Sequence, residues 1–242
     1  MPPRPDSVVL VTGAAGGIGR EVVVRLHARG HRVVATDSAL ADLPCTGPVV
    51  AMPLDVTDES AVLDCVSLVI ARYSRLDHVV HLAGRAGSGP LERVSGEEWD
   101  EIVAVNLGAA HRVARACREA LIASSGSLIL TASSNAFNGG SALSGPAYAA
   151  SKAGVVNLTR YLAREWAPLG VRVNCVSPGP IATPMVTGRF SPEVLERLRV
   201  SVPLGRIGEP RHVVHAIEYL LHPDAEFVTG TVMNVSGGVV MG

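Results

Sequence analysis

Seven short apolar runs, rich in β-branched residues, recur along the chain and alternate with longer stretches of helical periodicity. Runs that are apolar on both faces are typical of strands buried in a parallel sheet, and the alternation is typical of βαβ units. We therefore predict one α/β domain with a doubly wound, seven-stranded parallel sheet and helices on both faces. The predicted strands are SVVLVTG, HRVVATD, PVVAMPLD, LDHVVHLAG, GSLILTAS, VRVNCVSPG and GTVMNVSGG.

Amphipathic patterns predict five long helices between these strands, over residues 17–29, 58–73, 97–122, 146–167 and 210–222. Together the elements fill the 242 residues, so we expect a single domain. One long connection, roughly 178–209 with its central part at about 184–205, is punctuated by Pro and Gly and contains the short helical piece SPEVLERLRV. A connection of this length is usually functional. We predict a lid there, with an ordinary surface excursion as the alternative.

Composition narrows the class of partner. Hydrophobic residues make up 48% of the chain and the formal net charge is -1, so neither nucleic acid nor an anionic membrane surface is an expected partner. We find no membrane-length apolar run and no signal-peptide core at the N-terminus, and we expect a cytoplasmic protein. The 4 cysteines form no CxxC pair and the histidine pairs lack further ligands, so no metal site is expected.

A glycine-rich turn, TGAAGGIGR, follows the first predicted strand and opens the first predicted helix. Gly13, Gly17 and Gly19 allow a sharp turn, a close approach of the backbone to a pyrophosphate and tight packing of the helix on the sheet. The helix N-terminus favours an anion. The turn, with Ile18 inside it, therefore predicts a Rossmann-type dinucleotide site.

Asp37 ends the second predicted strand, about twenty residues after the turn. A carboxylate there can accept hydrogen bonds from an adenosine ribose and would repel a 2′-phosphate, which predicts NAD rather than NADP. A solvated acid at a strand end is the alternative. Asp55, followed by Val56, closes the third strand and is a candidate for the adenine edge. Its alternative role is a helix cap.

Tyr148 and Lys152 stand four residues apart in a predicted helix, and Lys152 is the only lysine among the 21 lysines and arginines. At this spacing the two side chains share one helix face. A neighbouring cation stabilises a phenolate and lowers the pKa of a tyrosine from about 10, which suits proton transfer to or from an alcohol. A compact ammonium can also bind ribose hydroxyls, a combination that the broader guanidinium of arginine does not match.

The motifs TGAAGGIG, HLAG, NLG, SS, YAASK and PGPIATPM occur in an order and at spacings that resemble the short-chain dehydrogenase/reductase family. The resemblance extends from Val8 to about Gly238. It implies a single-domain oxidoreductase that interconverts a small-molecule secondary alcohol and its ketone by hydride transfer with NAD(H). It also implies a homo-oligomer, a dimer or tetramer, assembled through the helices at 97–122 and 146–167.

The resemblance also implies roles for individual residues. Tyr148 matches the general acid/base, Lys152 the lysine that binds the nicotinamide ribose, and Asn106 the asparagine that holds a water near that lysine. Ser134 is our choice for the serine that binds the substrate oxygen. The further cofactor contacts implied are Ala83, Gly84, Pro178, Gly179, Ile181 and Thr183.

Two departures from the family pattern raise questions. The family has thirteen residues from the serine to the tyrosine, whereas Ser134 is fourteen before Tyr148. The residue at thirteen is Asn135, which has no hydroxyl, and Ser133 would point to the other side of the strand, so Ser133 is held as the reserve. HLAG stands where the family has NNAG, so His81 and Leu82 replace two amides, and we expect different bracing of the sheet without loss of activity.

Two other functions are weighed against the enzyme. A regulator or scaffold that binds NAD without turnover would need the glycine turn and Asp37 but not the Tyr148–Lys152 pair. The larger sugar-nucleotide epimerase or dehydratase branch shares YxxxK but needs more chain for a substrate domain. The sequence does not identify the substrate.

Overall fold

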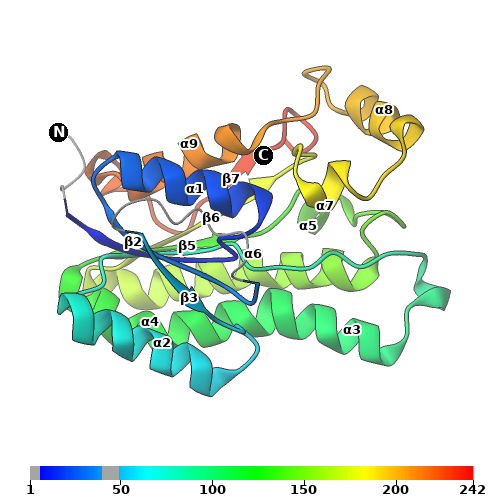
Figure 1. Ribbon diagram of the computed structural model, residues 1–242. Coiled ribbons are helices and arrows are strands. Elements are labelled where there is room, and N and C mark those ends of the chain that lie inside the picture. The colour runs from blue at the N-terminus through cyan, green and yellow to red at the C-terminus, as the bar shows by residue number, and fades with distance from the viewer. Residues whose placement is uncertain (1–5, 40–48, 242) are drawn as a thin grey trace.

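The computed structural model describes residues 6–39 and 49–241. Seven parallel strands form one sheet in the order β3-β2-β1-β4-β5-β6-β7, shown in Figure 1. The strands are β1 (Val8–Thr12), β2 (Arg32–Asp37), β3 (Val50–Pro53), β4 (His78–His81), β5 (Ser127–Thr131), β6 (Arg172–Pro178) and β7 (Val232–Val235). The predicted fold class is confirmed, although Pro48, the first residue of the third predicted run, lies outside the described residues.

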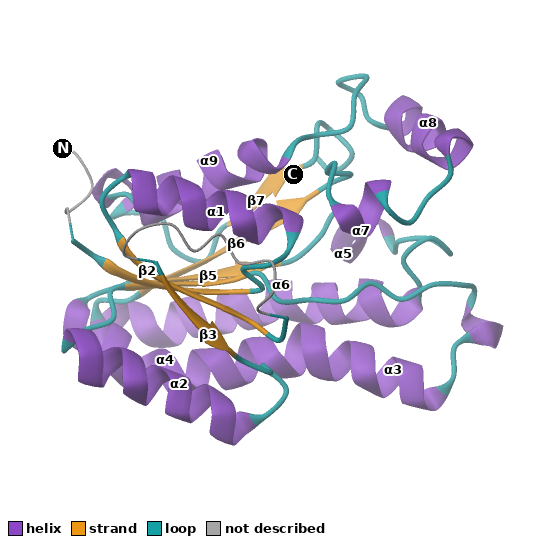
Figure 2. Cartoon of the chain, in the orientation of Figure 1, coloured by secondary structure: helices purple, strands orange, loops and turns teal. Residues whose placement is uncertain are grey.

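Helices cover both faces of the sheet (Figure 2). One face is covered by α1 (Gly17–Ala28) and α9 (Pro210–Leu221), and the other by α2 (Glu59–Tyr73), α4 (Ala109–Ser124) and α6 (Pro146–Trp166). The remaining helices are η1 (Leu91–Arg93), α3 (Gly96–Val103), η2 (Ala104–Gly108), α5 (Asn135–Asn138), η3 (Ala167–Leu169), α7 (Pro184–Thr187), α8 (Pro192–Ser201) and η4 (Pro223–Ala225).

Each face of the sheet has its own hydrophobic core. In β5, Leu128 and Leu130 pack towards α2, α4 and α6, whereas Ile129 between them packs towards α1 and α9. This follows from the alternation of side chains along a strand. Trp166, at the end of α6, is among the largest fully buried side chains on the first face. Full burial of such side chains stabilises the fold by about 1.5–3 kcal/mol each.

The helix predicted as one element over 97–122 is interrupted. α3 passes into the π-helical turn η2, which leads into α4, so the prediction of an unbroken helix is corrected. A π-turn inserts one residue into the helical repeat and is frequent at functional sites. Here it contains Asn106.

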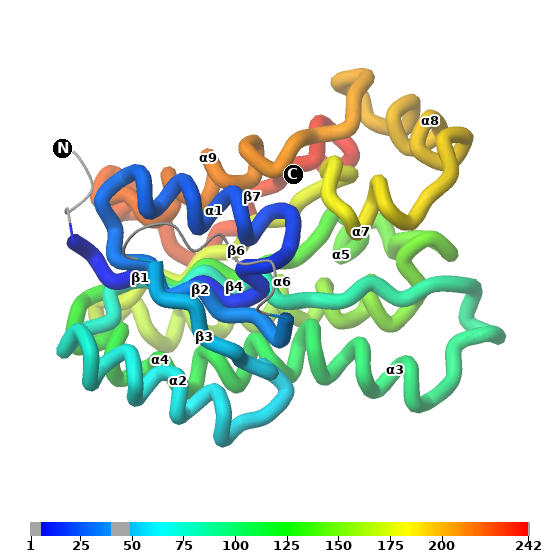
Figure 3. The backbone as a smooth tube through the Cα atoms, in the orientation of Figure 1, coloured from blue at the N-terminus to red at the C-terminus, as the bar shows by residue number. Residues whose placement is uncertain are grey.

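The long connection after β6 forms α7 and α8, which Figure 3 shows as a yellow to orange excursion beside the sheet. Two contacts fix its base. Ile181 pairs with Gly208 in an isolated parallel bridge, and the Leu204 N–H donates to the Gly237 carbonyl at 3.1 Å. The two ends of the connection are therefore joined to each other, and its second end is also bonded to the chain just after β7, with α7 and α8 between these attachments.

No helix in the described part of the chain combines the length and the hydropathy that a membrane crossing requires. The strands all point one way, so their carboxyl ends share one edge of the sheet. Ligands of doubly wound folds bind at that edge. The segments that follow the strands at this edge are the glycine turn, α5, the start of α6 and the base of the α7–α8 excursion.

Candidate active site

The glycine turn joins β1 to α1 where the backbone leaves no space for side chains. Gly13 has a φ of +69°, and a Cβ added there would lie 2.5 Å from the Ala83 nitrogen. A Cβ on Gly19 would lie 2.1 Å from the Gly13 carbonyl oxygen. Both positions require glycine, and the turn brings the N-terminus of α1 against the end of β4.

A cavity of about 920 Å³ extends along this turn. Among the predicted cofactor residues, those that line it are Gly13, Gly17, Ile18, Gly19, Asp37, Asp55, Val56, Ala83, Gly84 and Thr183. The cavity thus combines a helix N-terminus, a carboxylate at the end of β2 and an apolar wall. These residues fit a dinucleotide, with its pyrophosphate at the turn and its adenosine ribose at Asp37.

Two acids in this cavity are held by local hydrogen bonds. Asp37 Oδ2 accepts from the Ala15 N–H at 3.0 Å, which fixes the carboxylate beside the turn. Asp55 Oδ1 accepts from the N–H and the hydroxyl of Thr57 at 2.8 and 2.7 Å. The cap of α2 is Asp58, whose side chain accepts from the N–H groups of Ser60 and Ala61. Asp55 is therefore not the cap that was its alternative role.

A second cavity, of about 210 Å³, adjoins the first and shares Ile18, Leu82, Gly84 and Thr183 with it. It contains Tyr148 and Lys152, both from the first turns of α6. Of the predicted residues after β6, Pro178, Gly179, Ile181 and Thr183 line it too. The structure therefore brings the predicted proton-transfer pair to the edge of the cofactor cavity.

Burial shapes the chemistry of this pair. It raises the pKa of Tyr148, and a side-chain hydrogen bond with Ser133 offsets part of that rise. Burial lowers the pKa of Lys152 to about 8. The Lys152 Nζ donates to the Thr131 carbonyl at 2.8 Å and lies 5.7 Å from the centroid of the Tyr148 ring. An ammonium near a phenol can stabilise the phenolate. Burial nevertheless dominates here, so the pKa of Tyr148 is raised, and the lowered pKa that the sequence predicted is corrected.

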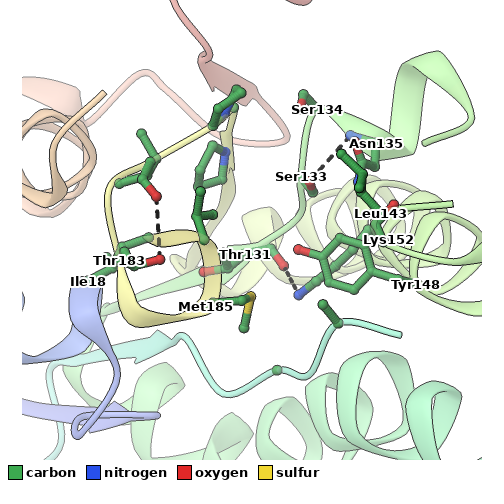
Figure 4. A pocket seen from close by; sticks show the side chains of 18 of the residues that line it. Ile18, Thr131, Ser133, Ser134, Asn135, Leu143, Tyr148, Lys152, Thr183 and Met185 are labelled. Carbon is green, nitrogen blue, oxygen red and sulfur yellow. Dashed lines mark hydrogen bonds between the residues drawn. The ribbon is translucent and has the colours of Figure 1, made fainter. Parts of the chain in front are cut away.

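The structure favours Ser133 over Ser134 as the serine beside the tyrosine. Ser133 forms a side-chain hydrogen bond with Tyr148. Ser134 directly precedes α5 without a side-chain cap bond, and its N–H donates to the Pro178 carbonyl at 2.9 Å. Figure 4 draws Ser134 farther from the tyrosine ring. Our choice of Ser134 relied on strand alternation and on a residue count. β5 ends at Thr131, so the alternation of a strand does not extend to Ser133 and Ser134.

Asn106 forms hydrogen bonds that connect the loop after β4 to α6, next to the cavity. Its Oδ1 accepts from the Arg85 N–H at 2.9 Å and its Nδ2 donates to the Arg85 carbonyl at 2.9 Å and to Ser151 Oγ at 3.1 Å. A Cβ on Gly84 would lie 2.9 Å from Asn106 Oδ1 and 3.3 Å from Lys152 Nζ. The π-turn therefore places Asn106 next to Lys152, with room between them only for a glycine.

His81 supplies the different bracing expected of HLAG. Its Nδ1 and the Thr12 hydroxyl are 2.7 Å apart, which ties the end of β4 to the end of β1. Burial lowers the pKa of His81 to about 3, and the positive charge of Lys152 acts in the same direction. His81 is therefore neutral at physiological pH. Leu82 packs at the edge of the core that is covered by α1 and α9.

Sequence reasoning missed part of the second cavity. Ser141 and Ser144, in the loop before α6, line it, as do Arg189 and Leu198 from the α7–α8 excursion. These residues belong to no short motif, and only the folded path of the two loops brings them to Tyr148. In the part of the chain that the structure describes, no group of three or more His, Cys, Asp or Glu residues could hold a metal ion.

Comparison with known proteins places this geometry among oxidoreductases. A family model described as enoyl-(acyl carrier protein) reductase matches residues 13–240. The 3-oxoacyl-[acyl-carrier-protein] reductase FabG of Thermotoga maritima is 34% identical, over 97% of this chain and 98% of the relative. The (3R)-3-hydroxyacyl-CoA dehydrogenase of Homo sapiens is 35% identical, over 98% of this chain and 96% of the relative.

A longer relative and a solved structure agree with this placement. An uncharacterized short-chain type dehydrogenase/reductase, y4vI of Sinorhizobium fredii, is 36% identical over 97% of this chain, which spans only 44% of that relative. The ligand-free structure of Thermoplasma acidophilum aldohexose dehydrogenase superposes with a TM-score of 0.88 at 30% identity. That match covers 97% of this chain and 94% of the other.

Proposed function

Since the chain belongs to the short-chain dehydrogenase/reductase family and is an oxidoreductase of hydroxyl and keto groups, we propose that it interconverts a secondary alcohol and its ketone with NAD(H). One observation carries the proposal. Tyr148, Lys152 and Ser133 meet in a cavity that opens onto the cavity of the glycine turn. A substrate oxygen at Tyr148 would thus lie beside a dinucleotide bound along the turn.

Tyr148 is the proposed acid/base. Burial keeps the phenol protonated near neutral pH, because it raises the pKa of the hydroxyl. Ketone reduction can therefore draw a proton directly from Tyr148, whereas alcohol oxidation requires the phenolate. The Lys152 ammonium stabilises that phenolate. When bound, the nicotinamide supplies or accepts the hydride.

Ser133 is proposed to position the substrate oxygen. Its hydroxyl bonds Tyr148 and faces the same cavity, so a carbonyl or hydroxyl oxygen can bind to both side chains at once. A donor aimed at the oxygen stabilises the negative charge that develops on it in the transition state. Ser134, which directly precedes α5 and lines the same cavity, is the alternative for this role.

NAD is proposed over NADP because of the surroundings of Asp37. The carboxylate lies at the end of β2 and is fixed by the Ala15 N–H, where ribose hydroxyls can donate to it. A 2′-phosphate at the same place would meet a like charge. Arg20 lines the same cavity, but its Nε donates to the Ala15 carbonyl at 2.8 Å.

A fluorescence titration with NADH and NADPH tests the cofactor proposal, and a panel of secondary alcohols with NAD⁺, followed at the nicotinamide absorbance, tests the reaction. We expect NADH to bind at least about tenfold more tightly, equivalent to about 1.4 kcal/mol. Asp37→Ala should reduce this preference. Asp64→Ala, which changes an exposed acid on α2, should not. Tighter binding of NADPH by the wild type would overturn the choice of NAD.

We also propose a cytoplasmic homo-oligomer, a dimer or tetramer. The support is the family pattern together with exposed apolar side chains on the surfaces concerned. Tyr161 on α6 is 66% exposed and Met241 in the C-terminal tail is 79% exposed. Light scattering after size exclusion should give a mass at least twice that of the 25.2 kDa chain, and a monomer at micromolar concentration would contradict the assembly.

A further inference from the structure

The walls of the substrate cavity carry charge of one sign. Among the described residues that line it, Lys152 and Arg189 are the only ones with a charged side chain, and both are cationic. The other lining residues include the apolar Leu143, Met185, Val186, Phe190 and Leu198, and polar groups, namely serine hydroxyls and Asn135. Lys152 already has a role at Tyr148. Arg189, in contrast, has no role in the proposed proton transfer.

Arg189 lines the cavity and is held by two contacts. Its Nη2 donates to the carbonyl of Gly87, in the loop after β4. Its guanidinium carbon lies 5.6 Å from the centroid of the Phe190 ring. The side chain thus joins the α7–α8 excursion to the loop after β4. A guanidinium has five N–H donors, so the Gly87 carbonyl leaves most of them available.

The described acidic side chains nearest to Arg189, in the sequence or beside the Gly87 loop, form no ion pair with it. Glu196 on α8 pairs with Arg199 at 2.6 Å, and Glu193 accepts a hydrogen bond from Ser191. Glu98 approaches the Gly87 loop, where its Oε1 lies 3.4 Å from the position of an added Cβ. No ion pair joins Glu98 or another acid to Arg189 within the described ranges 6–39 and 49–241. A ligand can therefore supply the counter-charge.

We propose that Arg189 binds a carboxylate of the substrate, and that the enzyme acts on a small hydroxy acid or keto acid. This inference rests on the proposed function. The planar fork of a guanidinium matches the two oxygens of a carboxylate. The cavity of about 210 Å³ is smaller than the 300–1,000 Å³ usual for drug-sized ligands, so the acid is a short one. Its carboxylate would lie at Arg189 and its hydroxyl at Tyr148 and Ser133.

The test compares acids with their neutral esters. Wild type, Arg189→Gln and Arg189→Lys are assayed with NAD⁺ and with 2-, 3- and 4-hydroxy acids of four to six carbons, alongside the corresponding methyl esters. A hydrogen bond to a charged group contributes about 1.5–3 kcal/mol, so kcat/KM for the best acid should exceed that of its ester by about 10- to 100-fold. Arg189→Gln should bring this ratio close to one, mainly through KM, and Arg189→Lys should restore part of it.

Arg197→Gln is the matched control, since Arg197 lies exposed on α8 and does not line the cavity. Calorimetry provides a readout that is independent of turnover. Butyrate and methyl butyrate are titrated into the enzyme with saturating NADH, and we expect only butyrate to bind, with binding lost in Arg189→Gln. If no compound of the panel is oxidised, this measurement still tests whether Arg189 binds a carboxylate.

Three results would overturn the inference: equal use of acid and ester by the wild type, an equal fall for both in Arg189→Gln, or equal binding of butyrate and methyl butyrate. The second would make Arg189 a latch for the excursion. If 3-hydroxybutyryl-CoA is used and depends on Arg189 while the free acids do not, the anion is a phosphate of the carrier, and the carboxylate assignment fails. Turnover of neutral secondary alcohols that depends on Tyr148 would leave the proposed function standing in each case.

Discussion

Both ends of the sheet bury polar side chains, but they engage them differently. At the amino end, Asp77 Oδ2 accepts from the Val8 N–H at 2.8 Å and its other oxygen pairs with Arg75. His78 Nδ1 lies 2.9 Å from Ser127 Oγ. These bonds join β4 to β1 and to β5. At the carboxyl end, Tyr148, Lys152 and Ser133 instead face a cavity.

The difference separates stability from function. A polar group that bonds a neighbouring strand holds the sheet together, and its removal leaves a buried partner unpaired at a cost of about 1–3 kcal/mol. A polar group that faces a cavity has bonding capacity left for a ligand, and its removal should affect turnover more than folding. We therefore expect substitutions at the amino end to lower mainly the free energy of unfolding, and substitutions at the cavity to lower mainly the activity.

Tyr148→Phe should show the largest effect on activity. The variant keeps the ring but removes the hydroxyl that exchanges the proton, so kcat should fall by about 10³-fold or more, with little change in NADH affinity or melting temperature. Tyr219→Phe, exposed on α9 and outside both cavities, is the control and should behave as wild type. If the activity of Tyr148→Phe is unaffected, the protein is not an enzyme of the proposed kind and the NAD-binding regulator becomes the better hypothesis.

Lys152→Arg should fold normally and lose about 100-fold in kcat. The space at Lys152 is closed by Gly84 and Asn106, and a planar guanidinium cannot place a compact charge near the phenol and also bind ribose hydroxyls. Arg160→Lys, at an exposed position of α6, is the control for an exchange between lysine and arginine outside the cavity. Steady-state assays and thermal melts measure both properties. A near-normal rate in Lys152→Arg would remove lysine from the proposed mechanism.

Acid should destabilise the fold through histidines at both ends. Burial lowers the pKa of His78 to about 4 and of His81 to about 3, whereas an unfolded histidine titrates near 6.5. Below pH 6.5 the unfolded chain therefore takes up protons that the native state does not, and the free energy of unfolding falls. Each histidine contributes up to about 1.4 kcal/mol per pH unit down to its folded pKa.

Urea denaturation at pH 7, 6 and 5, at one protein concentration, measures this dependence. His78→Gln and His81→Gln should each flatten the slope, and only His81→Gln, beside Thr12 and Lys152, is expected to alter activity as well. A slope equal to that of wild type in both variants would show that other groups cause the loss of stability in acid.

The sequence predicted what periodicity and motif spacing encode. The strands follow from short apolar runs, the glycine turn from its motif and the long helices from their amphipathic patterns, and the relation of Tyr148 to Lys152 follows from helical geometry. The residue count could not rank Ser133 against Ser134, because the path of the loop after β5, which contains α5, decides which hydroxyl meets Tyr148. Arg189 was missed because its position depends on the path of the α7–α8 excursion, which no local pattern specifies. The π-turn at Asn106 likewise leaves no signature in a helical period.

Three serine variants test most directly whether the side chains at one end of the sheet serve function and those at the other end serve stability. Ser133→Ala should lower kcat/KM by about 100-fold and leave the free energy of unfolding within about 0.5 kcal/mol of wild type, while Ser134→Ala changes the rate much less. Ser127→Ala should leave the rate of the folded enzyme unchanged and lower the free energy of unfolding by about 1–3 kcal/mol, because His78 loses its partner. A Ser127→Ala variant that loses activity while remaining stable, or a Ser133→Ala variant that keeps full activity, would contradict the account.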